Sequence, residues 1–226
     1  IQEACQRASK IVADMLAFSR SGDTHMTECD VRGMLEKTKG QIKLALPAHM
    51  TPDRMLRIAM TSIQKNPALL DCDRMSLVAA VIQSAQLGLE PDGALGMAYL
   101  VPYGKTVTFI PGYRGLVDLA RRSGQLSTIS AHVVYKKDIF KYTRGTDQKI
   151  EHIPYDGDDD PGEMTHAYAV AKLRDGGVQF EVMNRREIEA IRAKSPGKNS
   201  GPWKDHTAEM WKKTAIRRLA KLLPMS

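Results

Sequence analysis

The spacing of apolar residues along this 226-residue chain changes at Pro91. Up to residue 90 the apolar residues recur every three or four positions, as they do along one face of an α-helix. After Pro91 they alternate with polar residues and include many β-branched and aromatic types, which is typical of strands. Helices, then a central and mainly antiparallel sheet with one inserted helix, then further helices predict an α+β fold.

The first ninety residues contain clear signals for helix ends. Thr51-Pro52-Asp53 combines an N-cap, a proline at the first helical position and an acid near the positive end of the helix dipole. This helix should stop before Pro67, and a second should run from Asp73 or Ser76 to Leu87, with Gly88 as its stop. We also expect a helix over residues 1–20 and a polar connection over 21–30. As domains we expect an N-terminal helical extension, 1–35, and a core, 36–226, whose helical part is 36–90 and whose sheet and remaining helices are 91–226.

Beyond Pro91, tight turns separate the predicted strands. Gly104-Lys105 and Asp175-Gly176-Gly177 each lie between two strand-like segments, and glycine readily adopts the backbone conformations of hairpin turns. We expect strands at Met97–Tyr103, Thr106–Ile110, Leu126–Tyr135, Lys149–Pro154, Met164–Leu173 and Val178–Met183. We expect helices at Tyr113–Ser123, near Arg185–Lys194 and over roughly Trp203–Leu223.

Basic residues are concentrated towards the end of the chain. The net charge is +7, and residues 184–226 hold 11 Lys and Arg against 4 Asp and Glu, which accounts for the whole excess. A second basic stretch, residues 105–149, holds nine basic and three acidic residues, while 150–163 hold six acidic residues and no basic one. Such local basic fields favour a polyanionic partner.

The closing helix separates apolar from basic residues. At 100° per residue, one face carries Trp211, Ala215, Ile216, Leu219, Leu222 and Leu223. Lys213, Arg217 and Lys221 form a row on the other side, Arg218 lies at the boundary, and Lys212 falls among the apolar positions. A solvated face favoured by the helix dipole is the alternative to a binding surface. Because no acid follows Glu209 to neutralise the row, a polyanion such as nucleic acid is the preferred interpretation.

Three other segments combine cations with aromatic rings. In Gly112-Tyr113-Arg114-Gly115 the ring could stack on a base and the guanidinium could bind phosphate, although a tight turn with a core tyrosine explains Tyr113 alone more simply. Residues 135–144 interleave Lys136, Lys137, Lys141 and Arg144 with Tyr135, Phe140 and Tyr142, which suits a single strand or a solvated loop. Near Lys198, Trp203 is either a helix-start anchor, which we favour, or a base platform.

The sequence gives little support to catalysis. The acidic cluster Asp156-Gly157-Asp158-Asp159-Asp160 lacks the glutamate that closes an EF-hand, and a flexible acidic loop explains it better than a metal site. No phosphate-binding loop, GxGxxG, GxSxG or HExxH motif occurs, so we expect no enzyme, no metal and no cofactor. A metal-dependent nuclease using Asp156, Asp158 and Asp160 is the alternative from the enzyme class. Three scattered cysteines and the lack of a long apolar run suggest reduced thiols, no membrane and a cytoplasmic location.

Seven segments together resemble the RecT family of phage and prophage recombinases, in matching order over about residues 40–226. They are Ala48-His49-Met50-Thr51, Leu87-Gly88-Leu89-Glu90-Pro91, Gly112-Tyr113-Arg114-Gly115, Leu119-Ala120-Arg121-Arg122-Ser123-Gly124, Phe180-Glu181-Val182-Met183, Gly201-Pro202-Trp203 and Lys212-Lys213-Thr214-Ala215-Ile216-Arg217-Arg218-Leu219.

The resemblance implies ATP-independent binding of single-stranded DNA and annealing of complementary strands by a ring or helical filament of identical protomers. It also implies a fold distantly like that of eukaryotic annealing proteins, and as partners the annealed duplex intermediate, an exonuclease and a host single-strand binding protein. A passive protector of single strands is the nearest alternative. The candidate DNA contacts are Lys105, Tyr113, Arg114, Arg121, Arg122, Lys136, Lys137, Lys141, Lys198, Trp203, Lys212, Lys213, Arg217, Arg218 and Lys221.

Overall fold

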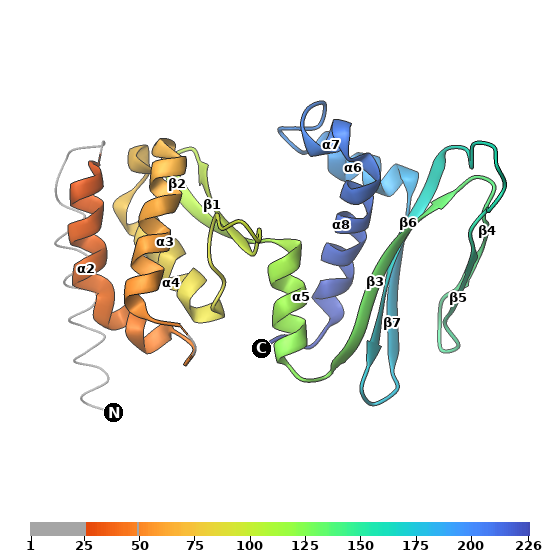
Figure 1. Cartoon of the computed structure of the whole chain (residues 1–226), viewed down its shortest axis with the longest axis horizontal. Coiled ribbons are helices and arrows are strands. Elements are labelled where there is room, and N and C mark those ends of the chain that lie inside the picture. The colour runs from red at the N-terminus through yellow and green to blue at the C-terminus, as the bar shows by residue number, and fades with distance from the viewer. Residues whose placement is uncertain (1–25, 49) are drawn as a thin grey trace. The chain divides into compact units, whose positions relative to one another are not determined.

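The computed structural model describes residues 26–48 and 50–226, and these form helices and antiparallel sheets, which confirms the α+β class (Figure 1). They divide into two compact units between Gly115 and Leu116. Each unit has a hydrophobic core of its own. The helix expected over residues 1–20 lies outside the described residues.

Helices of the first unit begin at side-chain caps. The capped helices are α2 (Glu28–Ala45), α3 (Pro52–Lys65) and α4 (Arg74–Leu87), and the 3₁₀ turn η1 (Pro67–Asp71), which has no side-chain cap, lies between α3 and α4. The predicted signals for α3 and α4 are confirmed, because Thr51 and Asp73 accept hydrogen bonds from the backbone N–H groups of Arg54 and Ser76. Gly88 ends α4 in the left-handed conformation, with φ 58°.

The polar connection expected over 21–30 is wrong from residue 28 onwards, where α2 begins. Thr27 and Asp30 form a capping box, in which each side chain accepts a hydrogen bond from the other residue's backbone N–H. Two polar residues in a polar stretch therefore mark a helix start rather than a loop.

A two-stranded hairpin completes the first unit. Strands β1 (Ala98–Tyr103) and β2 (Thr106–Pro111) pair antiparallel across the predicted turn, where Gly104 has φ 59°. Leu100 and Val107 are buried in the helical core, so the opposite face of the ribbon points away from it. Helix α5 (Tyr113–Arg122) follows and crosses the division between the units.

The second unit is built on a three-stranded antiparallel sheet, ordered β3 (Leu126–Tyr135), β6 (Met164–Leu173) and β7 (Val178–Asn184). Strands β4 (Ile139–Thr143) and β5 (Lys149–Ile153) form a separate hairpin. The strands thus form three small antiparallel sheets rather than one central sheet. Strand β4 was missed, because its residues were interpreted as a cationic stretch or loop.

One helix covers one face of this sheet. Helices α6 (Arg185–Ala193) and α7 (Pro202–Asp205) precede α8 (Thr207–Leu219), which lies along the sheet, while the β4–β5 hairpin lies on the other side (Figure 1). Ala167, Ala169 and Ala171 of β6 are fully buried beneath α8. Their small side chains let the helix approach the strand closely.

The closing helix is shorter than predicted. His206 has φ −137° and ψ 49°, which interrupts the expected helix between α7 and α8, and the 3₁₀ turn η2 (Ala220–Leu222) replaces its end. A 3₁₀ turn has three residues per turn, so the faces shift there. Ala220 is consequently buried and Leu222 is 57% exposed, which corrects the placement of Leu222 on the apolar face.

Candidate nucleic-acid interface

The cations of α8 differ in their surroundings. Lys212 donates a hydrogen bond to Glu209 of the same helix at 2.8 Å. Its ammonium group therefore points away from the apolar face on which the helical periodicity placed this residue. Arg218 pairs with Glu187 at 3.0 Å and with Glu181 at 3.6 Å. These two acids come from β7 and α6. The cations of α8 therefore have acidic neighbours in the folded unit that lie outside the sequence of α8 itself.

Lys213 is half-buried rather than fully solvated. Burial lowers the pKa of Lys213, and the positive charge of Arg217 lowers it further. Lys213 is therefore a poorer phosphate contact than the sequence suggested, because part of its side chain is already covered.

A groove of about 920 Å³ lies beside α8 in the second unit. Arg217, Arg218 and Lys221 line it, together with Glu181 and apolar side chains of α6 and of the chain end, such as Ile191 and Leu223. Three predicted cations thus share one concave surface with one carboxylate. Such a groove can follow a backbone of phosphates.

The basic residues of segment 135–144 are only partly available. Lys137 pairs with Asp159 and lies 5.0 Å from the centre of the Tyr155 ring, while Arg144 donates to Glu181 and to the backbone oxygen of Val182. Lys136 and Lys141 are exposed. Arg144 therefore holds the hairpin to the edge of β7.

The aromatic residues of the same segment pack inside the unit. Phe140 stacks on Tyr168, with ring centres 5.5 Å apart, and also contacts Tyr142, His152 and His166. His152 bridges the hydroxyl of Tyr168 at 3.1 Å and the carboxylate of Asp138 at 2.9 Å. This ring cluster holds the β4–β5 hairpin on the sheet, so the ring of Phe140 serves packing.

The start of α5 is a tight junction. A side chain at Gly112 or Gly115 would collide with the backbone oxygens of Gly96 or Met97, so both glycines serve a close approach within the chain itself. Arg114 is exposed and donates to the Tyr113 hydroxyl at 3.3 Å and to the oxygen of Leu95 at 3.4 Å. The hydrogen bond with Tyr113 raises the pKa of Arg114, which therefore stays charged.

At the other end of α5, Arg121 is exposed and Arg122 pairs with Asp118. The first unit thus holds Lys105, Tyr113 and Arg114 among the predicted contacts, and the second unit holds the others.

Trp203 is a core residue. Its side chain is 6% exposed, it belongs to the same cluster as Trp211, and the Arg192 guanidinium lies 5.8 Å from the centre of its ring. It is the helix-start anchor, and we withdraw it as a base platform because no face of the ring is open. Lys198 is exposed in the preceding loop, where its backbone oxygen accepts from Arg192.

Two pairs of exposed residues were not predicted from the sequence. Tyr99 and Tyr103 are 41% and 57% exposed on the outer face of the β1–β2 ribbon, and their signal is the period of two that places them opposite the buried Leu100. Arg185 and Arg186 occupy the first turn of α6, and their signal is two cations at the helix end where the dipole favours acids.

Carboxylates of the acidic loop, residues 156–160, form hydrogen bonds with neighbouring residues of the same unit. Asp159 accepts hydrogen bonds from Lys137 and Tyr155, and Asp160 accepts one from the backbone N–H of Gly162 at 2.7 Å. Within residues 26–48 and 50–226, no group of three or more His, Cys, Asp or Glu side chains is arranged to hold a metal ion. None of the helices in the same ranges is long and apolar enough to cross a bilayer.

Comparison with known proteins decides the family. The family model described as "RecT family" matches residues 53–226 of this chain. The chain belongs to the RecT family. Among its relatives, Protein RecT of Escherichia coli (strain K12) is 55% identical over 196 residues, which cover 83% of this chain and 72% of that protein. The uncharacterized protein YqaK of Bacillus subtilis (strain 168) is 28% identical over 146 residues, covering 64% of this chain and 50% of that protein.

Membership of the RecT family confirms the resemblance carried by the seven segments. It supports a role in recombination by single-strand annealing. In this RecT-family chain, most of the basic residues proposed as DNA contacts lie on the second unit, on or beside α8 and around its three-stranded sheet.

Proposed function

We propose that this protein binds single-stranded DNA without ATP and anneals complementary strands as a ring or helical filament of identical protomers. The family match over residues 53–226 carries the proposal, since it spans parts of both units. The groove beside α8 and the exposed cations around the sheet are consistent with a substrate held by its phosphates. Pairing between the strands drives annealing, so the proposal requires no catalytic group.

Annealing requires strands whose base edges stay free to test pairing. Cations should therefore contact phosphates, which gives strong salt dependence and little sequence preference. Several of the proposed contacts make no ion pair with any residue of the described ranges: Lys105, Arg121, Lys136, Lys141, Lys198 and Lys221.

Other proposed contacts already have acidic partners, as Arg122, Lys137, Lys212 and Arg218 do. Exposed ion pairs contribute only about 0–1 kcal/mol, so a phosphate can replace a carboxylate at these positions. We rank these residues below the cations without an ion pair, because a phosphate would have to displace a carboxylate from each of them.

The exposed face of the β1–β2 ribbon offers a different kind of contact. Tyr99 and Tyr103 present open rings there, with Lys105 in the adjoining turn. Stacking on tyrosine is tolerant of sequence because every base has an aromatic face. We propose that this ribbon contacts bases while the cations hold the backbone.

As partners we propose, in addition to the DNA and further copies of the chain, an exonuclease that exposes single strands and a host single-strand binding protein. The cytoplasm is the location that such a role requires. These proposals rest on family membership alone.

Binding measurements test the proposal. Fluorescence anisotropy with labelled single strands of several sequences, in buffer with EDTA and no nucleotide, should give similar affinities that fall steeply with salt. In a second buffer with fixed Mg²⁺ and ionic strength, adding ATP should leave the affinity unchanged. A requirement for ATP, or affinities set by sequence, would count against it. Electron micrographs with complementary strands should show rings or filaments, and isolated protomers on DNA would refute the assembly.

A further inference from the structure

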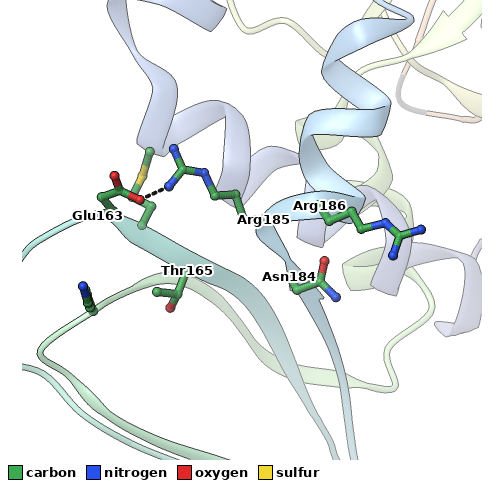
Figure 2. A pocket seen from close by; sticks show the side chains of 7 residues that line it. Glu163, Thr165, Asn184, Arg185 and Arg186 are labelled. Atoms are coloured by element: carbon green, nitrogen blue, oxygen red, sulfur yellow. Dashed lines mark hydrogen bonds and ion pairs between the residues drawn. The ribbon is translucent and has the colours of Figure 1, made fainter.

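A basic depression lies at one end of the three-stranded sheet, where β3 and β7 end and where β6 and α6 begin. It has a volume of about 480 Å³ and is lined by Lys136, Glu163, Met164, Thr165, Asn184, Arg185 and Arg186 (Figure 2). The strand register brings these ends together, since Tyr135 is opposite Met164 and Asn184 is opposite His166.

The depression carries an excess of positive charge. Its lining contains three cations, Lys136, Arg185 and Arg186, and one carboxylate, that of Glu163, which leaves a formal charge of +2. Arg185 pairs with Glu163, whereas Arg186 extends away from that pair (Figure 2). Neither Arg186 nor Lys136 pairs through its side chain with an acid in residues 26–48 or 50–226.

Helix stability does not account for the two arginines. They occupy the first turn of α6, where the dipole disfavours a cation by about 0.3–1 kcal/mol. The end of the helix is already capped, because Asn184 accepts from the backbone N–H of Glu187 at 3.0 Å and Glu187 accepts from that of Asn184 at 3.0 Å. The arginines therefore neither cap the helix nor stabilise its dipole. Arg185 already pairs with Glu163, whereas an anion outside the chain would give Arg186 a role.

We propose that this depression binds a backbone phosphate of the single strand, an inference that rests on the proposed DNA-binding function. Arg186 and Lys136 supply the two charges without an acidic partner, and a guanidinium offers paired donors that match phosphate oxygens. The oxygen of Asn184 serves the helix cap, which leaves its amide NH₂ group as a further donor.

Glu163 has a distinct part in this site. Its carboxylate rests on Arg185 and lies at the rim of the depression, so it is an internal anion in the place that a phosphate would approach. A bound phosphate competes with Glu163 for Arg185. Removing the charge of Glu163 should therefore strengthen DNA binding, whereas removing the cations should weaken it.

Paired variants test the site on the full chain. Lys136→Ala with Arg186→Ala should weaken oligo-dT binding about tenfold and lower the slope of log affinity against log salt by about 0.7, the value for one lost phosphate contact. Glu163→Gln should strengthen binding several-fold. The control is Lys172→Ala with Arg174→Ala, which removes two exposed charges at the other end of β6 and should change the slope less.

The outcomes separate this site from general electrostatics. A wild-type slope in the Lys136/Arg186 variant, an equal loss in the control, or no gain with Glu163→Gln would each overturn the proposal. Circular dichroism of each variant checks folding, and all the substituted side chains are exposed.

Two further measurements identify the source of the phosphate and the link to function. Inorganic phosphate at millimolar concentration and constant ionic strength should not displace oligo-dT, and displacement would assign the site to free phosphate instead. The annealing rate of the wild type is measured in parallel. If the wild type binds DNA through this site but does not anneal, the annealing proposal fails and the phosphate site stands.

Discussion

At the scale of single residues, the groove beside α8 is the part of the interface that the closing helix contributes most directly. Arg217 and Lys221 lie one turn apart and line it together, whereas Lys213 is not among its lining residues. Arg217 and Lys221 are therefore the pair to substitute.

Arg217→Ala with Lys221→Ala should weaken single-strand binding and lower its salt slope by about 1.4, since two phosphate contacts are lost. Anisotropy titrations between 50 and 300 mM salt measure both quantities. The Lys172/Arg174 variant again controls for net charge. A folded variant with unchanged affinity and slope would remove this helix from the DNA site.

For Trp203 we predict an effect on stability, because its ring is buried in the core of the second unit. Trp203→Ala should lower the free energy of unfolding by about 3–5 kcal/mol, as large-to-small core substitutions do. Trp203→Phe should keep much of that stability. Urea denaturation followed by circular dichroism provides the measurement, and a Trp203→Ala protein as stable as the wild type would contradict the core assignment.

At the scale of elements, substitutions in the β1–β2 ribbon and in the cationic surfaces should have different effects on the salt dependence of DNA binding. Tyr99→Ala with Tyr103→Ala should weaken single-strand binding, by about 1–3 kcal/mol for each base that loses a stacking partner, and leave the salt slope unchanged. The matched Tyr→Phe pair keeps the rings and should bind like the wild type. A changed slope, or an equal loss with phenylalanine, would show that the rings do not stack on bases.

The ring cluster beneath the β4–β5 hairpin predicts a pH dependence of stability. Burial lowers the pKa of His166, with Glu187 opposing the effect. A histidine with a depressed folded pKa contributes its full stability above its unfolded pKa of about 6.5 and loses it as the pH falls towards the folded value.

The melting temperature should therefore fall from pH 7.5 to pH 5.5. His166→Asn should flatten this dependence, while His206→Asn, which changes an exposed ring, should not. Differential scanning calorimetry at a series of pH values gives the result. An equally steep dependence in the His166→Asn variant would exclude this ring as its source.

Local signals in the sequence were enough to place many of the elements. Caps and turns depend on a few adjacent residues, and so Thr51, Asp73, Gly88 and Gly104 marked helix and strand ends correctly. Strand β4 was missed because its inward residue Phe140 finds its partner Tyr168 only through the tertiary fold.

The candidate site was less predictable than the fold, because ion pairs form across long sequence separations. Arg218 meets Glu187 and Glu181, which lie 31 and 37 residues earlier in the chain, so a helical wheel could not show its partners. The basic depression likewise depends on register, since it joins Lys136 to Arg186 through the paired ends of three strands.

At the scale of the whole molecule, annealing requires many weak phosphate contacts rather than one tight site. In the ring or filament that we propose, many protomers bound to one strand would multiply their affinity by holding the strand at a high effective concentration. Family membership and the exposed cations support this account. Whether the protein speeds or slows the pairing of two strands distinguishes an annealing protein from a passive protector.

The rate at which complementary strands pair tests the central claim most directly. Stopped-flow energy transfer between two labelled complementary oligonucleotides, in EDTA without nucleotide, is measured with increasing protein. We predict pairing several-fold faster than the spontaneous reaction, with a maximum when the strands are nearly covered. Pairing that is unchanged or slowed at every protein concentration would contradict the account and identify a passive protector.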